Sequence, residues 1–420
     1  MKLSTIVNNI LFLLWVVLLG KRINLVGSIS ITELFVITQI PFLYKWMKNL
    51  NFKEIYKLKN LFILLFCSQL FSEILLKNSF QNAIKGLMIT IMAFFVILFF
   101  MREIIYKKCS LIAIPIGFIL SRLIFGDQFG YAESGDESVY FKFYIVPLVM
   151  NGVCVLFLLN NKWINRNVIF IFFFSSVFMM IGGSRTGGFT MLLSLLLYLA
   201  VKRYRNLSWS RFLKALIPLL IIAEIFYAFV YVPKVKTGEW GSEQNRIQMA
   251  SIDYSKNGLM LVMAARQDFF VSFVAFMDKP ILGHGAWARD KTLKYTILSA
   301  KMSGEDESKI FNSIDYFGVP LIPCHSILVG AGTRNGILAF VTFFCVFLFV
   351  YKKSFRLLMS SPPYLPYVCY LIVSSLQAVL FSPPAILKGN IAVMWATLLA
   401  LYYFNSKIKN NEIICSNRNV

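Results

Sequence analysis

Three basic residues, far apart in the sequence, are of types that bind phosphate or activate a hydroxyl group. They are Arg185, Arg266 and His325, in a chain of 420 residues. An arginine guanidinium can hold a phosphate through two parallel hydrogen bonds. A histidine titrates near neutral pH and can therefore take a proton from a hydroxyl group. Together these residues suit the binding of a phosphate group and the activation of a hydroxyl group.

Arg185 lies in the segment 181–189, which has the sequence IGGSRTGGF. The glycines allow backbone N–H groups to approach a ligand, and the apolar stretch that follows predicts a helix that begins here. Free N–H groups, the positive end of a helix dipole and a guanidinium suit a phosphate. Ser184 and Thr186 flank the arginine and are further candidates for substrate binding. An interfacial arginine beside a tight turn is the structural alternative.

Arg266 lies in the segment 259–277, whose spacing predicts an amphipathic helix. Four large apolar residues fall within about 60° of Arg266 on a helical projection: Met263, Phe270, Phe273 and Met277. The arginine is therefore expected in the apolar stripe, where a helix lying on a membrane would aim it at a lipid phosphate. The alternative is a helix packed inside a polar loop, with Arg266 in a salt bridge.

His325 lies where a long polar segment returns to apolar sequence, and it is the stronger of the two histidines as a candidate base. A lone histidine with a structural role is the alternative. His284 is the weaker candidate, because it lies between two glycines in the expected turn PILGHG at 280–285. Arg289 is a further candidate for substrate binding. Acidic residues of the same polar segment are candidate helpers: Asp268, Asp278 and Asp315.

No pattern in the chain predicts a metal site. The sequence has no D-x-D motif and no dense cluster of Asp and His residues. Its seven cysteines form no CxxC pair, and most lie in or beside apolar runs. Such a distribution is typical of small buried side chains rather than of zinc ligands or a disulfide framework. We therefore expect chemistry that uses neither a metal nor a cofactor.

The elements that must position these residues are membrane helices. Hydrophobic residues make up 58% of the chain and charged residues 15%, against about 25% charged residues in a soluble domain. Long apolar runs without alternation indicate helices that satisfy their own backbone hydrogen bonds in lipid, and argue against a β-barrel. The predicted fold class is an all-α polytopic membrane protein.

We expect about twelve transmembrane helices and one long loop that contains the amphipathic helix. The first apolar run ends in Gly-Lys-Arg rather than in small residues, which predicts a span and not a signal peptide. Helices one to nine are expected in 1–232, the long loop in 233–326, three helices in 327–404 and a tail in 405–420. The predicted spans are 5–19, 26–44, 61–76, 86–101, 110–125, 139–159, 168–181, 189–201, 215–232, 335–351, 364–381 and 391–404.

The distribution of charge predicts the orientation of the chain. With the N-terminus inside, the inner segments hold about half of the 42 Lys and Arg, together with only three acids. The outer segment 126–138 holds four acids and no Lys or Arg, and the loop 233–326 is nearly neutral. Both termini are therefore expected inside, with the long loop outside. The net charge of +22 follows this topology, so no nucleic-acid partner is expected.

Five charged residues lie inside predicted spans, where facing lipid would be costly. They either form structural pairs or reach an interface, or else they line a polar cavity or a substrate path. The sequence does not decide between these roles. The residues are Glu33, Glu73, Arg122, Lys142 and Glu224.

Between residues 181 and 348 the chain resembles the bacterial O-antigen polymerase and O-antigen ligase family. The resemblance consists of the Ser-Arg-Thr turn at 184–186, an arginine that starts an aromatic helix, PILGHG at 280–285, and His-Ser-Ile-Leu at 325–328. Each motif is weak alone, but their order and spacing together are more specific. The first 180 residues match only in hydropathy.

The resemblance implies a multi-span, metal-independent glycosyltransferase of the bacterial inner membrane. Its donor would be a glycan linked to undecaprenyl pyrophosphate, used at the periplasmic face. Arg185 and Arg266 would hold the pyrophosphate, and His325 would activate the acceptor hydroxyl. Expected partners are the lipid-linked oligosaccharide, membrane lipids and a chain-length regulator protein.

Three functions follow from these observations. The first is a polymerase that moves a growing glycan onto a new lipid-linked repeat unit. The second is a ligase that passes the finished glycan to lipid A core. Ligases of the family often follow the histidine with Asn, where this chain has Ser326, which favours the polymerase. The third is a flippase or transporter of polysaccharide lipids, which often shows an internal repeat that this sequence lacks.

Overall fold

The structure is a computed structural model, and within its described residues the chain is almost entirely helical. The described sheet is one antiparallel hairpin, formed by β1 (Arg22–Leu25) and β2 (Gly27–Ser30). The predicted all-α class is therefore confirmed for this part of the chain. The described residues are 3–25, 27–50, 52–126, 140–159, 161–203, 229, 232–240, 266–303, 318–360, 362 and 364–416.

Six described helices are long and apolar enough to cross a membrane, by length and composition, and each coincides with a predicted span. They are α3 (Lys53–Leu75), α4 (Phe80–Ile105), η2 (Phe141–Ile145) continued by α7 (Val146–Leu159), α8 (Lys162–Ile181), α17 (Ile327–Met359) and the first part of α19 (Asn390–Ser416). Shorter apolar helices are α1 (Leu3–Leu18), α5 (Ala113–Phe125) and α18 (Leu365–Phe381).

Two more predicted spans, 189–201 and 26–44, coincide in part with helices. Helix α9 (Arg185–Arg203) begins four residues before the predicted span 189–201. Most of the predicted span 215–232 lies outside the described residues. These helices indicate a protein embedded in a membrane.

The second predicted span, 26–44, begins too early. Residues 22–25 and 27–30 form the strands of the β1–β2 hairpin, and α2 (Ile31–Asn49) starts only after Ser30. The cause is a capping box: the Ser30 hydroxyl accepts from the backbone N–H of Glu33, and the Glu33 carboxylate accepts from the N–H of Ser30. This arrangement satisfies two N–H groups that a helix start leaves without partners.

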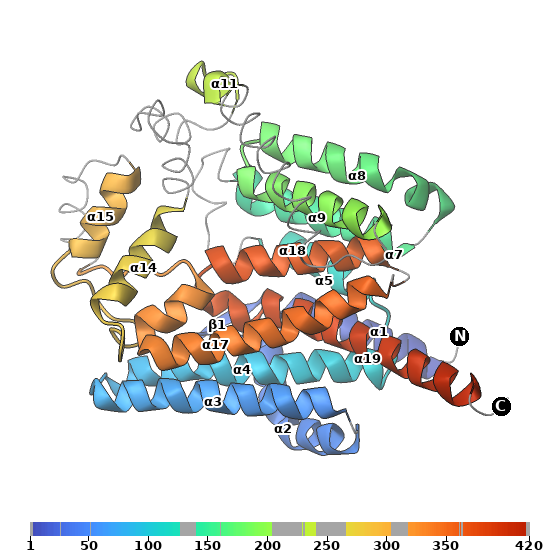
Figure 1. Cartoon of the computed structure of the whole chain (residues 1–420), viewed down its shortest axis with the longest axis horizontal. Helices are drawn as coiled ribbons and strands as arrows, with labels where there is room; N and C mark the ends of the chain where they lie inside the picture. Colours follow the sequence, from blue (N-terminus) through green and yellow to red (C-terminus); the bar gives the residue numbers. More distant parts are fainter. Residues whose placement is uncertain are drawn as a thin grey trace.

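Most of the described helices pack around two large apolar cores, and a smaller one joins α14 (Gln267–Asp278) and α15 (Lys294–Ser303); Figure 1 shows how the helices are arranged. Helices α1, α2, α3, α4, α17 and α19 bury one of the two large cores, in which Phe12, Phe100 and Trp395 are fully buried. Helices α7, α8, α9 and α18 bury the other, around Phe172 and Met191. The short helices α14 and α15 lie at one end of the bundle, and the two chain termini lie at the other.

Helix α17 is broken near its first third. Asn335 and Gly336 leave helical geometry, and Gly336 has a φ of 76°, which favours glycine. A Cβ atom on Gly336 would lie 1.9 Å from the carbonyl oxygen of Ile281. The break leaves the N–H of Ile337 without a helical acceptor. This N–H donates instead to the Pro280 carbonyl (2.7 Å) in the turn at 280–285. The predicted span 335–351 therefore begins at the break, and eight further helical residues precede it.

Glu33 and Arg122, two of the charged residues inside predicted spans, have hydrogen-bond partners within the protein. Glu33, 2% exposed, accepts from the Nζ of Lys388 at 2.7 Å. Arg122 donates to the carbonyl of Gly126 at the end of its own helix (3.4 Å). For these residues the structural interpretation holds. Glu224 lies outside the described residues.

Glu73 has the most extensive network of this group. The carboxylate is 3% exposed and accepts three hydrogen bonds. Its Oε1 accepts from the backbone N–H of Ala286 (2.8 Å) and from Asn335 Nδ2 (2.6 Å), and its Oε2 accepts from Asn78 Nδ2 (2.6 Å). One side chain thus joins α3, the segment after the PILGHG turn and the break of α17.

We predict that Glu73→Ala destabilises the protein strongly. It would leave two buried donors, the N–H of Ala286 and the Nδ2 of Asn335, without an acceptor, each costing about 1–3 kcal/mol. Thermal unfolding of the detergent-purified protein should shift down by about 5 °C or more. The matched control is Glu239→Ala, which removes an exposed bridge to Lys234 that contributes about 0–1 kcal/mol. Equal unfolding temperatures for the two variants would refute the role of Glu73.

Candidate functional site

His325 is held in an extended segment directly before α17. The next residue, Ser326, caps that helix, because its hydroxyl accepts from the N–H of Val329 (3.1 Å). The preceding Pro323 carbonyl accepts from the hydroxyl of Ser272 on α14 (2.9 Å). The Thr333 hydroxyl in turn donates to the Ser272 carbonyl (2.8 Å). The backbone on both sides of His325 is therefore fixed by α14 and α17.

His325 pairs with an acid from α14. Its Nδ1 lies 2.9 Å from Oδ2 of Asp268, in the first turn of that helix. The other carboxylate oxygen of Asp268 accepts from the Ser299 hydroxyl on α15 (2.9 Å). A carboxylate at Nδ1 favours the tautomer with its proton on that nitrogen, which leaves Nε2 to accept a proton from a substrate. The arrangement is that of an oriented general base.

The Asp268 carboxylate is held in its ionised form. Burial by itself raises the pKa of Asp268, but the hydrogen bonds from His325 and Ser299 and the charge of His325 outweigh it and lower the pKa. The stabilisation from this pair is therefore present above the ordinary carboxylate pKa. It is lost only as the pH falls through the lower pKa of the folded protein. At neutral pH the acid remains available to orient the histidine.

Arg266 is bound across the site to the turn that contains Arg185. Its Nη2 donates to the hydroxyl of Thr186 (2.8 Å), and its guanidinium lies 4.5 Å from the ring centre of Phe381 on α18. Burial, with a smaller contribution from the charge of Arg185, lowers the pKa of Arg266 to about 10. The guanidinium is still protonated at neutral pH, so it is a positive charge largely removed from water.

The spacing predicted that Arg266 lies in the apolar stripe of a helix, and this prediction is wrong. Helix α14 begins at Gln267, and Arg266 directly precedes it with a backbone φ of −136°. Met263 lies outside the described residues. Because the arginine is at the helix start, its side chain is free to cross to Thr186 and Phe381 instead of following the face of Phe273 and Met277.

A cavity of about 630 Å³ joins these groups. Its wall includes His325, Asp268, Arg266 and Thr186, and it continues along α5, α7, α18 and α19. The volume lies within the ~300–1,000 Å³ range of ligand pockets. Ser184 also lines the cavity, although its hydroxyl accepts from the N–H of Gly187 (3.4 Å) at the start of α9.

Lys142 adds a further positive charge to the cavity wall. It lies in the π-helical turn η2, and it is close enough for the charges of Arg185 and Arg266 to act on it. Such π-helical turns occur frequently at functional sites. Clustered cations in a partly buried cavity are unfavourable unless an anion compensates them. The sequence marked Lys142 only as a charge inside a span, and the structure shows which cavity it lines.

The other candidates lie differently. Arg185 is the first residue of α9 and acts on Arg266 and Lys142 through its charge, but it is not among the described residues that line the cavity. Arg289 donates to the Val319 carbonyl (2.6 Å) and lines neither of the two larger described cavities. Asp315 lies outside the described residues.

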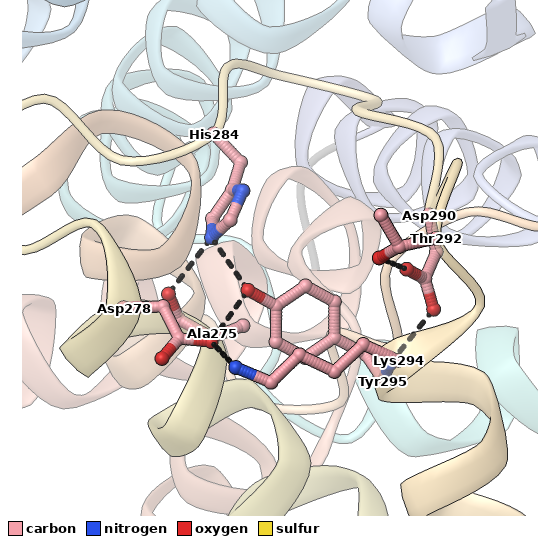
Figure 2. Close-up of polar contacts among 7 residues, drawn as sticks. All are labelled: Ala275, Asp278, His284, Asp290, Thr292, Lys294 and Tyr295. Atoms are coloured by element: carbon pink, nitrogen blue, oxygen red, sulfur yellow. Dashed lines mark hydrogen bonds and ion pairs between the residues drawn. The ribbon is translucent and has the colours of Figure 1, made fainter.

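His284 belongs to a separate structural network, shown in Figure 2. Its Nε2 lies 2.8 Å from the Ala275 carbonyl and 3.4 Å from the Tyr295 hydroxyl. That hydroxyl donates to Asp278 (2.7 Å), which also accepts from Lys294 (2.5 Å). Burial lowers the pKa of His284 against the raising effect of the Ala275 hydrogen bond, so the ring is neutral at pH 7. The network ties α14 to α15.

Within the described residues, no group of three or more His, Cys, Asp and Glu side chains is placed to hold a metal ion. The arrangement offers an oriented base, a set of cations and a cavity that continues between membrane helices. Neither a scan against protein-family models nor a search of curated proteins found a match for this chain.

We predict that the cavity binds inorganic pyrophosphate and that Lys142→Gln and Arg266→Gln each weaken this binding about tenfold or more. Each variant removes a hydrogen bond to a charged group worth about 1.5–3 kcal/mol. Isothermal titration of the purified protein measures the affinity. Arg289→Gln is the matched control and should bind pyrophosphate as the wild type does. A loss in the control equal to that in the two variants would show that the effect is only one of net charge.

Proposed function

We propose that this chain is a membrane glycosyltransferase that polymerises O-antigen or a related surface polysaccharide. The observation that carries the proposal is the His325–Asp268 pair, 2.9 Å apart, on the wall of the same cavity as Arg266 and Lys142. A base for the acceptor and cations for a pyrophosphate leaving group are the two requirements of such a transfer. The resemblance at residues 181–348 points to the same chemistry.

In the proposed reaction the donor is a glycan linked to undecaprenyl pyrophosphate. The pyrophosphate lies against Arg266, Lys142 and the turn that contains Arg185. His325 Nε2 takes the proton of an acceptor hydroxyl, and that oxygen forms a bond with the anomeric carbon of the donor. The bond between this carbon and the pyrophosphate oxygen breaks, and the electron pair leaves with undecaprenyl pyrophosphate. The cations stabilise the charge that develops on the leaving oxygen.

Asp268 has a supporting role in this scheme. It keeps the Nδ1 proton on His325 and stabilises the imidazolium that forms when Nε2 accepts a proton. Removal of a general base typically costs about 10²–10⁴-fold in rate. The lipid tail of the donor would follow the part of the cavity between α5, α7, α18 and α19, since these are apolar helices.

We also propose the finer membrane topology. About twelve spans cross the inner membrane, both termini are cytoplasmic, and the segment 233–326 is periplasmic. In support, the two termini lie at the end of the helical bundle opposite α14 and α15 (Figure 1). The partners would be the lipid-linked oligosaccharide, membrane lipids and a chain-length regulator protein.

The central test is the lipopolysaccharide ladder of cells that carry Arg185→Ala, Arg266→Ala, His325→Ala or Asp268→Asn. We expect the Arg266 and His325 variants to lose the ladder above a single repeat, and the Arg185 and Asp268 variants to shorten it strongly. Arg289→Ala, produced at the same level by immunoblot, should give a normal ladder. Normal ladders from all four variants would refute the site.

Deletion of the gene separates the proposed function from its alternatives in the same gels. Loss of a polymerase leaves core with one repeat unit, whereas loss of a ligase leaves bare core. Accumulation of lipid-linked units on the inner leaflet would instead identify a flippase. Either of the last two outcomes would replace the polymerase assignment.

The topology has its own prediction. Alkaline phosphatase fused after Trp240 should be active, because it would be exported to the periplasm. Green fluorescent protein fused to the C-terminus should fluoresce, because it folds in the cytoplasm. Inactive alkaline phosphatase together with a dark green fluorescent protein would overturn the proposed orientation.

A further inference from the structure

The His325–Asp268 pair borders a second cavity. This cavity has a volume of about 440 Å³, again within the ~300–1,000 Å³ range of ligand pockets. Both side chains of the pair, together with Pro383, line the two cavities. The candidate base therefore lies in a wall that two separate ligands can reach from different cavities.

The two cavities differ in their lining. The first runs between apolar helices and has the cations Lys142 and Arg266 in its wall. The second is built from the segment after the PILGHG turn, from α15, from the extended stretch 320–325 and from the first turns of α17. Its polar lining residues include Thr296, Ser299 and Thr333, whose hydroxyls donate within the protein and keep oxygen lone pairs for a ligand. Such a lining suits a sugar ring rather than a lipid chain.

Trp287 is the distinctive residue of the second cavity. It has a φ of 58°, a left-handed conformation that a bulky side chain adopts only under constraint. Its indole N–H is buried and has no acceptor among the described residues. The guanidinium of Arg334 lies 5.4 Å from the centre of its ring. The ring is thus placed by its backbone and by a cation, and not by a hydrogen bond of its own.

The backbone around Trp287 is fixed by three hydrogen bonds. The N–H of His284 donates to the Thr333 carbonyl (2.8 Å), and the N–H of Gly285 donates to the Arg334 carbonyl (2.7 Å). The N–H of Ala286 donates to the buried Glu73 carboxylate (2.8 Å). Strained residues held by their surroundings in this way gather at ligand-binding sites.

We infer that the second cavity is a sugar subsite that binds the terminal, hydroxyl-bearing sugar of the acceptor, with Trp287 and Arg334 as its recognition residues. An indole ring stacks on the apolar face of a pyranose, while a guanidinium and hydroxyl groups bond to the sugar oxygens. The inference rests on the proposed function and deepens it. It assigns the terminal sugar of the acceptor to the second cavity and the donor pyrophosphate to the cationic cavity.

The geometry gives each substrate its own approach to His325. A sugar in the second cavity presents a hydroxyl to the ring across the shared wall. The anomeric carbon of the donor lies on the other side, next to the pyrophosphate bound by Arg266 and Lys142. Ser299 links the two cavities. It lines the second cavity, and its hydroxyl donates to Asp268 (2.9 Å), which lines both.

The test is binding of two probes to the full-length protein in lipid nanodiscs. One probe is the free oligosaccharide repeat unit, released by mild acid from the lipid-linked intermediates of the host strain. The other is inorganic pyrophosphate. Trp287→Ala and Arg334→Gln are expected to weaken oligosaccharide binding about tenfold or more and to leave pyrophosphate binding within about twofold of the wild type. Trp287→Phe, which keeps an aromatic face, should lose less than Trp287→Ala.

Trp163→Ala is the matched control, because Trp163 is 64% exposed on α8 and lines neither of these two cavities. It should bind both probes as the wild type does. Retained pyrophosphate binding also shows that the Trp287 variants are folded.

Oligosaccharide binding to Trp287→Ala at wild-type strength would overturn the subsite, and so would a wild-type protein that does not bind the oligosaccharide. A parallel loss of both probes in Trp287→Ala would overturn it as well, because the two cavities would then not be separate sites. The proposed function fails on a different result, namely a gene deletion that leaves bare core or accumulates lipid-linked units on the inner leaflet. The two failures are therefore distinguishable.

Discussion

The arrangement of the site depends on one buried carboxylate. Glu73 of α3 accepts from the backbone of Ala286 and from the side chain of Asn335. It thereby holds the turn at 280–286 against the point where α17 leaves helical geometry. It acts together with the backbone hydrogen bonds that join His284, Gly285 and Pro280 to α17. A buried charge is tolerated here because several donors compensate the loss of its hydration.

Further contacts lead from the anchored turn to His325 and Asp268. The anchored turn is matched to α17 so closely that Gly336 has no space for a side chain. Helix α17 in turn fixes the direction of the extended segment that carries His325. Helix α14 is bonded to that segment through Ser272 and supplies Asp268. The histidine and its acid, 57 positions apart in the sequence, thus meet through backbone contacts rather than through their own attraction.

Much of the fold class could be predicted from the sequence, because hydropathy reports directly on burial in lipid. Ser30 and Glu33 have the residue types and spacing of a capping box, which indicates a helix start. The apolar run around them nevertheless favoured a span from residue 26, so the β1–β2 hairpin was not predicted. The described structure brings Arg266, His325 and Thr186 to one cavity, as their residue types suggested. It gives Arg289 a different contact. The pairing of His325 with Asp268 rather than Asp278, and the place of Lys142, could not be predicted, because both depend on contacts between distant segments.

The shared wall between the two cavities has a consequence for chain growth. If the acceptor sugar is bound on one side and the donor pyrophosphate on the other, each transfer leaves the lengthened glycan attached to the lipid that entered as acceptor. That lipid must then move its pyrophosphate into the cationic cavity, and the spent carrier must first depart. Growth would proceed by exchange of carriers within the bilayer, one unit per exchange. The residence time of a carrier in the cationic cavity would then influence the length of the finished polymer.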